Sequence, residues 1–273
     1  ATISDIYAMN TYAQQIVVSM GMSQKFSVEM VEELFSGMRV ACESYGVDLV
    51  GGDTTSSLSG LVLSLTAYGQ AKEEALTYRS GAKDGDLICV SGDLGAPLLG
   101  LTVLEREKKV FMDNPEVQPS LEGYDTILQK HLRPEARRDM VDMLSSYQVK
   151  PNAMIDVSDG VASDILHICK GSNLGCRIQE ADLPIPDDTY NHAMKFSLDP
   201  TICVLNGGEE YQLLFTLSES AYEAISEVKD VSVIGTMMPP EEGRKLVTRS
   251  NNEYELKAQG WNAFAEQQNE TSS

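Results

Sequence analysis

Three short segments of the chain set carboxylates beside glycines at the end of an apolar stretch. They are residues 49–57 (LVGGDTTSS), 154–160 (MIDVSDG) and 205–211 (LNGGEEY). Glycines let backbone N–H groups approach a phosphate closely, and all-oxygen ligands suit hard cations such as Mg²⁺ or Ca²⁺. Since loops at strand ends gather ligand-binding groups, these segments predict a site for phosphate and a hard cation.

Asp156 and Asp159 form the sharpest carboxylate pair, at the end of a predicted strand. Taken alone, Asp159 is also typical of the N-cap of the helix that follows, and Asp156 of a turn. Asp53, which follows Gly51 and Gly52, is equally typical of a tight turn with a side-chain hydrogen bond to the backbone. The residues by themselves leave the structural and the functional interpretations open.

The chain carries a large excess of negative charge. Its 273 residues include 41 Asp and Glu against 21 Lys and Arg, which gives a formal net charge of −20. This charge repels a nucleic-acid backbone, so we expect no nucleic-acid partner, and a phosphorylated substrate needs cations between itself and the protein. No run reaches the roughly 20 apolar residues of a membrane span, so we expect a soluble globular protein and no membrane partner.

Several other chemistries lack their sequence signatures. The five cysteines form no CxxC pair, which predicts buried, reduced thiols in a cytoplasmic protein. The three histidines lie far apart, which disfavours a zinc site. No Walker A sequence, Gly-x-Ser-x-Gly elbow or Gly-x-Gly-x-x-Gly fingerprint occurs, so P-loop, hydrolase and hydride-transfer chemistry are disfavoured.

Hydrophobic periodicity and capping residues predict an α+β (mixed α/β) protein. In the first part we expect strands at residues 14–21, 47–50 and 61–67, and a helix capped by Ser27 at 27–45. The polar, glycine-rich residues 79–86 indicate a boundary between two domains. In the second part we expect strands at 87–91, 153–157, 210–216 and 231–236, helices at 97–105, 134–146, 159–170 and 219–228, and a surface excursion at 107–126.

Five motifs follow one another along the chain: residues 4–10 (SDIYAMN), 50–55 (VGGDTT), 79–82 (RSGA), 155–160 (IDVSDG) and 207–213 (GGEEYQL). With HLRP at 131–134 and GWNAF at 260–264, the set resembles the thiamine-monophosphate kinase family, in the superfamily of aminoimidazole-ribonucleotide synthetase and selenophosphate synthetase. The resemblance implies a two-domain, aminoimidazole-ribonucleotide synthetase-like architecture. Residues 1–80 would form the N-terminal ATP- and metal-binding domain, through which relatives form homodimers, and residues 81–273 the C-terminal α/β domain.

The resemblance also implies an activity, which is ATP-dependent phosphorylation of thiamine monophosphate to thiamine diphosphate with several Mg²⁺ ions. It assigns metal binding to Asp5, Asp53, Asp156 and Asp159, a catalytic role to Asp53 and Asp159, nucleotide binding to Phe35, Gly52, Asp53, Arg79 and Ser158, and substrate binding to Glu209 and Trp261. Phe35 is equally typical of core packing on its helix. Because no His or Cys is placed as a relay, we expect direct in-line transfer without a phosphorylated enzyme.

The chain departs from the family pattern in three respects. Relatives begin with a segment that holds a Gly-Asp-Asp motif, a Thr-Asp pair and a Gly-x-His-Phe stretch, and the sequence contains none of these. We therefore expect an incomplete N-terminal domain. If the segment is truly absent, part of the metal site and a substrate contact are lost, and the chain would be inactive on its own. Glu210 stands where Asp is usual, and Asn10 stands where Gly is usual, a position at which Asn tolerates positive φ.

Two alternatives remain open on the sequence. One is another ATP-dependent synthetase of the same superfamily, although the GWNAF and GGEEY segments favour the thiamine branch. The other is a non-catalytic nucleotide- or metal-binding module.

Overall fold

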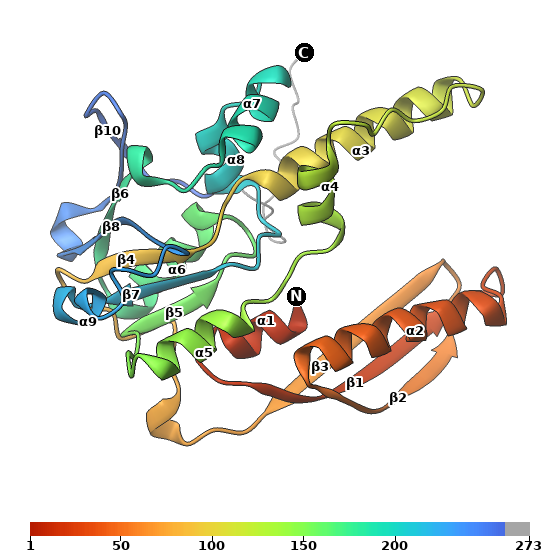
Figure 1. Cartoon of the computed structure of the whole chain (residues 1–273), viewed down its shortest axis with the longest axis horizontal. Coiled ribbons are helices and arrows are strands. Elements are labelled where there is room, and N and C mark those ends of the chain that lie inside the picture. Colours follow the sequence, from red (N-terminus) through yellow and green to blue (C-terminus); the bar gives the residue numbers. More distant parts are fainter. Residues whose placement is uncertain (260–273) are drawn as a thin grey trace, which may run out of the picture.

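A three-stranded sheet forms the first part of the chain, and one long helix covers one of its faces (Figure 1). The computed structural model describes residues 1–259. The strands are β1 (Ala13–Met22), β2 (Asp48–Ser56) and β3 (Leu61–Gly69), in the order β2-β1-β3. Strand β1 pairs with β2 in parallel and with β3 in antiparallel fashion, so within residues 1–259 both outer strands present an open edge.

Helix α2 (Val28–Tyr45) has the capping residues that its sequence predicts. The Ser27 hydroxyl accepts a hydrogen bond from the Met30 N–H, and Gly46 ends the helix in the left-handed region at φ 65°. Cys42 of the helix belongs to the same buried cluster as Ile16 and Val18 of β1. The predicted amphipathic helix and central strand are therefore confirmed, and they pack on each other.

A seven-stranded sheet forms the second part, in the order β10-β9-β6-β8-β4-β7-β5. Its strands are β4 (Leu87–Ser91), β5 (Ala153–Asp156), β6 (Gly175–Gln179), β7 (Leu213–Leu217), β8 (Val231–Met238), β9 (Arg244–Val247) and β10 (Glu253–Glu255). The main helices of this part are α3 (Ala96–Asp113), α4 (Asp125–Leu132), α5 (Arg138–Ser146), α6 (Val161–Ser172), α7 (Asp187–Lys195), α8 (Pro200–Asn206) and α9 (Glu219–Glu223). The α+β fold class is confirmed.

Side chains of β4 and β7 alternate between two buried clusters, one on each face of the larger sheet. Ile88 and Leu214 point into the cluster that contains α6, whereas Cys89 and Phe215 point into the cluster that contains α5. Because both faces are covered, the strands are apolar on both faces, with Ser91 in β4 and Thr216 in β7 as the exceptions. Tyr7 of the short helix α1 (Thr2–Tyr7) joins the second cluster, so the N-terminal end of the chain packs on the larger sheet.

Some expected boundaries were wrong, and the first concerns residues 49–57. Gly51, Gly52 and Asp53 lie inside β2 and do not form a turn after it. A Cβ atom on Gly52 would lie 1.9 Å from the Val18 carbonyl oxygen, so the parallel pairing with β1 leaves room for glycine alone at this position.

Three further boundaries also differ from expectation. Residues 205–211 begin with the last two residues of helix α8 and continue as a loop, so they do not follow a strand. Helix α3 continues to Asp113, which shortens the expected surface excursion. Helix α5 begins at Arg138, so Pro134 lies in the connection after α4 and not in the first turn of a helix. The division at residue 80 stays an expectation.

None of the helices within residues 1–259 combines the length and the apolar character that a membrane crossing requires.

Phe215→Ala tests the central position of β7. Phe215 is 0% exposed, so we expect the substitution to lower the free energy of unfolding by about 3–5 kcal/mol through lost burial and a cavity. Phe111→Ala is the matched control, because Phe111 is 43% exposed on α3 and should cost less than about 1 kcal/mol. Urea unfolding followed by circular dichroism measures both, and equal losses would contradict the described core.

Candidate active site

A cluster of carboxylates lies where α1 meets the end of β5. Asp156 is the last residue of β5, is buried, and accepts a hydrogen bond of 2.6 Å from the Ser4 hydroxyl to Oδ2. Burial raises the pKa of Asp156, and the negative charge of Asp5 raises it further. Asp5, Arg79 and Asp156 line one cavity of about 380 Å³. The fold therefore brings together three residues that are separated from one another by at least 74 positions in the sequence.

The loop after β5 presents Ser158 and Asp159 at the start of α6. Asp164 Oδ2, in the first turn of α6, accepts hydrogen bonds from the Ser158 and Asp159 N–H groups at 3.1 and 3.3 Å. Burial, followed by the charge of Asp159, raises the pKa of Asp164 to about 8. Asp164 thus binds the backbone N–H groups that precede the helix, and the N-cap residue, Gly160, makes no side-chain hydrogen bond. The exposed carboxylate of Asp159 is therefore not the helix cap.

The 207–212 loop, which follows α8, packs on this same turn. The Glu209 and Tyr211 N–H groups donate to the Ser158 and Val157 carbonyls at 2.8 and 2.9 Å. The Tyr211 hydroxyl donates to Glu209 Oε2 at 2.8 Å, which fixes the orientation of that carboxylate. Burial raises the pKa of Tyr211, and so do the nearby charges of Glu209, Asp156 and Asp5. Glu209 therefore lies at the same cluster as Asp5 and Asp156.

The remaining predicted site residues lie elsewhere. Phe35 is on α2, and Gly52 and Asp53 are on β2, which runs away from α1 and β5 (Figure 1). Phe35 lines a shallow apolar groove between α2 and β2 instead of the buried core. Trp261 lies outside the described residues.

The carboxylate cluster suits a hard cation by its donor atoms, which are all oxygens. Burial is the main cause of the raised pKa of Asp156, and the negative charge of Asp5 adds to it; a cation bound at these two carboxylates would offset their mutual repulsion. Within residues 1–259, however, the structure gathers no group of three or more His, Cys, Asp or Glu side chains around a single metal position.

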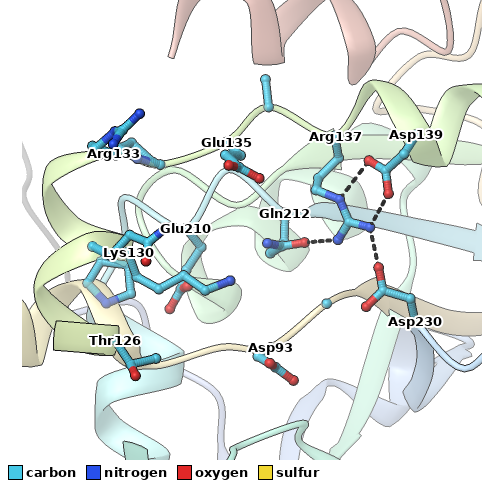
Figure 2. A pocket seen from close by; sticks show the side chains of 15 residues that line it. Asp93, Thr126, Lys130, Arg133, Glu135, Arg137, Asp139, Glu210, Gln212 and Asp230 are labelled. Carbon is cyan, nitrogen blue, oxygen red and sulfur yellow. Dashed lines mark hydrogen bonds and ion pairs between the residues drawn. The ribbon is translucent and has the colours of Figure 1, made fainter. Parts of the chain in front are cut away.

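A second cavity, also of about 380 Å³, is lined by Glu210 and Gln212 of the 207–212 loop (Figure 2). Glu210 points into it, is 5% exposed, and accepts a 2.5 Å hydrogen bond from the Gly95 N–H. Burial raises the pKa of Glu210 to about 8, and Lys130 at the mouth of the cavity opposes this rise. The motifs at 131–134 and 207–213 include residues that line this cavity, but no sequence pattern pointed to the cavity itself or to Arg137, which also lines it.

Residues 1–71 match the family described as AIR synthase related protein, N-terminal domain. The thiamine-monophosphate kinase of Aquifex aeolicus is 28% identical over 263 residues, which cover 96% of this chain and 78% of the relative. That of Buchnera aphidicola subsp. Schizaphis graminum is 30% identical over 268 residues, 96% of this chain and 77% of the relative.

The chain belongs to the thiamine-monophosphate kinase family. Among solved structures, AaThiL complexed with AMPPCP and TMP superposes with a TM-score of 0.78 at 28% identity, covering 96% of this chain and 77% of that one. The hydrogenase maturation protein HypE in complex with ATP superposes with a TM-score of 0.75 at 17% identity, which shows a shared fold alone. The expected resemblance is confirmed, and the family's kinases share the fold described above.

Glu210→Gln tests the buried carboxyl of the second cavity. The pKa of Glu210 is raised from 4.5 to about 8 in the folded state, so folding favours its protonated form. Its contribution to stability is complete below the unfolded pKa of 4.5 and is lost as the pH rises through about 8. Glutamine keeps the shape and the acceptor for Gly95 but cannot ionise.

We therefore expect the free energy of unfolding of the wild type to fall relative to that of Glu210→Gln between pH 5 and pH 8.5, by on the order of a few kcal/mol. Chemical unfolding at a series of pH values measures this difference. Glu116→Gln removes an exposed carboxyl and serves as the control, with parallel curves expected. Parallel curves for Glu210→Gln as well would show that Glu210 is ionised in the folded state.

Proposed function

We propose that this chain transfers the γ-phosphoryl group of ATP to the phosphate of thiamine monophosphate, giving thiamine diphosphate and ADP. The observation that carries the proposal is its similarity, along 96% of its length, to AaThiL complexed with AMPPCP and TMP, a complex that contains an ATP analogue. The carboxylate cluster of Asp5, Asp156 and Glu209 supports it, because phosphoryl transfer between two anions depends on positioned charges more than on covalent chemistry.

Asp5, Asp156 and Asp159 would hold Mg²⁺ in this proposal, with Asp53 as a fourth ligand. Bound Mg²⁺ would neutralise the negative charge of the phosphate oxygens, which a chain of net charge −20 otherwise repels. Arg79 lines the same cavity as Asp5 and Asp156, and we assign it to the nucleotide phosphates together with Ser158.

The residues that line this cavity include neither His nor Cys. The transfer is therefore proposed to be direct and in line, with Asp53 and Asp159 as the residues on which turnover depends most, and without a phosphorylated side chain.

Glu209 is assigned to the thiamine end of the substrate. Its carboxylate is fixed by the Tyr211 hydroxyl and lies next to the cluster, so it can offset the positive charge of the thiazolium ring without moving. Trp261, which lies outside the described residues, is proposed to stack on a cationic ring of the same substrate.

Phe35 lies on α2, and Gly52 and Asp53 lie on β2 of the three-stranded sheet, away from the cluster of this chain. We propose a homodimer through this sheet, which would surround Asp53 with residues of a second chain. The open edge of β2 and the exposed apolar side chains Val50 and Val62 support this. A cytoplasmic location is proposed because all five cysteines are buried and unpaired.

The activity is tested by incubating the protein with ATP, Mg²⁺ and thiamine monophosphate and following the products by ³¹P NMR. We expect thiamine diphosphate and ADP in equal amounts. Formation of ADP with an imidazole ribonucleotide precursor or with selenide, but not with thiamine monophosphate, would reverse the assignment in favour of a synthetase. Binding of ATP without any turnover would favour a non-catalytic module.

Asp156→Asn and Asp159→Asn are expected to lower kcat by at least about 100-fold, because each removes a charge that holds the cation. The fold should persist, since neutralising Asp159 removes repulsion from Asp164. Steady-state kinetics and circular dichroism check both statements. Asp113→Asn, at the exposed end of α3, is the control and should keep wild-type turnover; a wild-type kcat in either test variant removes that residue from the site.

A further inference from the structure

Arg137 lines the second cavity and makes polar contacts with three side chains, those of Asp139, Gln212 and Asp230 (Figure 2). It is 8% exposed, and its Nε and Nη2 atoms donate to the two carboxylate oxygens of Asp139 at 2.9 and 2.6 Å. Nη2 also pairs with Asp230, just before β8, and Nη1 donates to Gln212 Oε1 at 2.5 Å. Arg137 is thus a buried node between α5, β8 and the end of the 207–212 loop.

Gln212 makes hydrogen bonds through both its side chain and its backbone. Its Oε1 atom also accepts from the Ser91 hydroxyl at 2.8 Å, and its backbone carbonyl accepts from the Val157 N–H at 2.8 Å. A Cβ atom on Gly92 would lie 2.5 Å from Gln212 Oε1 and 2.8 Å from Arg137 Nη1, so a side chain at position 92 would collide with both groups. Gln212 therefore fixes the end of the loop at which β7 begins.

The loop that Gln212 anchors has an unfavourable backbone. Gly208, Glu209 and Tyr211 all adopt positive φ angles, of 64°, 58° and 53°. Glutamate and tyrosine pay a steric penalty in this region, which glycine does not, so such a loop persists only where its surroundings determine its path. The loop is supported by the two hydrogen bonds to the Val157–Ser158 turn, by the hydrogen bond from the Gly95 N–H to Glu210, and by the Gln212 anchor.

We propose that Arg137 is a positioning residue for the substrate site. Through Gln212 it holds the 207–212 loop in the conformation that presents Glu209 to the carboxylate cluster on the opposite side. Arg137 itself touches neither the cluster nor the cavity of Asp5 and Asp156, so its effect reaches the substrate through the loop alone. The inference rests on the proposed function only in its assignment of Glu209 to the substrate.

A purely structural role for Arg137 is the competing explanation, because the guanidinium also neutralises Asp139 and Asp230. Two substitutions separate these roles. Gln212→Met breaks the link to the loop and leaves both ion pairs of Arg137 in place. Asp230→Asn weakens a half-exposed ion pair and leaves the link to Gln212, so it is the matched control.

Hydrogen exchange reports on the loop without reference to activity. In Gln212→Met we expect the peptides that cover residues 207–212 to exchange at least about tenfold faster than in the wild type, while α6 keeps its protection. Asp230→Asn should exchange like the wild type. If Gln212→Met does not fold, Arg137→Lys is used instead, because lysine keeps a positive charge but lacks the second donor that reaches Gln212. Unchanged exchange over 207–212 in the folded variant overturns the proposal.

Kinetics then test the link to the substrate. We expect the KM for thiamine monophosphate to rise about tenfold in Gln212→Met, with the KM for ATP within about twofold of the wild type. Equal changes in both constants, or an unchanged KM for thiamine monophosphate despite faster exchange, would show that the loop does not position a substrate contact. A wild type without kinase activity would refute the proposed function, and the exchange experiment would still decide whether Arg137 holds the loop.

Discussion

The repulsion between carboxylates that the backbone holds together is the constraint on which this structure depends. The negative charges of Asp5, Asp156 and Glu209 all act on the Tyr211 hydroxyl, so the three carboxylates lie close together. The chain as a whole already carries a net charge of −20. Each is held by a specific neighbour: Ser4 binds Asp156, Tyr211 binds Glu209, and Asp5 is carried on α1, which packs on the larger sheet. In the proposed function, cations bound at the cluster would offset this repulsion.

Two neighbouring glutamates show how strongly position decides chemistry in this protein. Glu209 and Glu210 follow each other in the 207–212 loop, yet they face opposite sides of it. Glu209 lies beside the carboxylate cluster and is oriented by a tyrosine hydroxyl. Glu210 is buried in the second cavity, where burial raises its pKa to about 8. The left-handed conformation at Glu209 accompanies this change of direction, and the Arg137–Gln212 anchor holds the far end of the loop.

Elements with a strong local signal could be predicted from the sequence. Helix α2 has a capping serine, a terminal glycine and a periodic apolar stripe, and β4 is a short apolar run between polar turns. Elements whose boundaries depend on distant partners were missed or misplaced. Gly52 suggested a turn, but it lies within β2. Glycine is needed at this position because a Cβ atom would collide with the Val18 carbonyl of the paired strand. Pro134 suggested a helix start, but the helix begins four residues later.

The sequence by itself determined the family, because the order of several short motifs survives without any knowledge of their contacts. It also identified Asp5, Asp156, Asp159 and Glu209 as the residues to examine. The tertiary structure decided which of these meet: α1, β5 and the 207–212 loop bring Asp5, Asp156 and Glu209 together, while Asp53 stays on a separate sheet. It also revealed the roles of Asp164 and Arg137, which no pattern indicated, and of Gln212, which the 207–213 motif contains without showing its contacts. The importance of these residues comes from hydrogen bonds to distant segments or to backbone groups that are otherwise unpaired. Local sequence encodes propensity and motif order, whereas electrostatic and hydrogen-bonding environments exist only once the chain has folded.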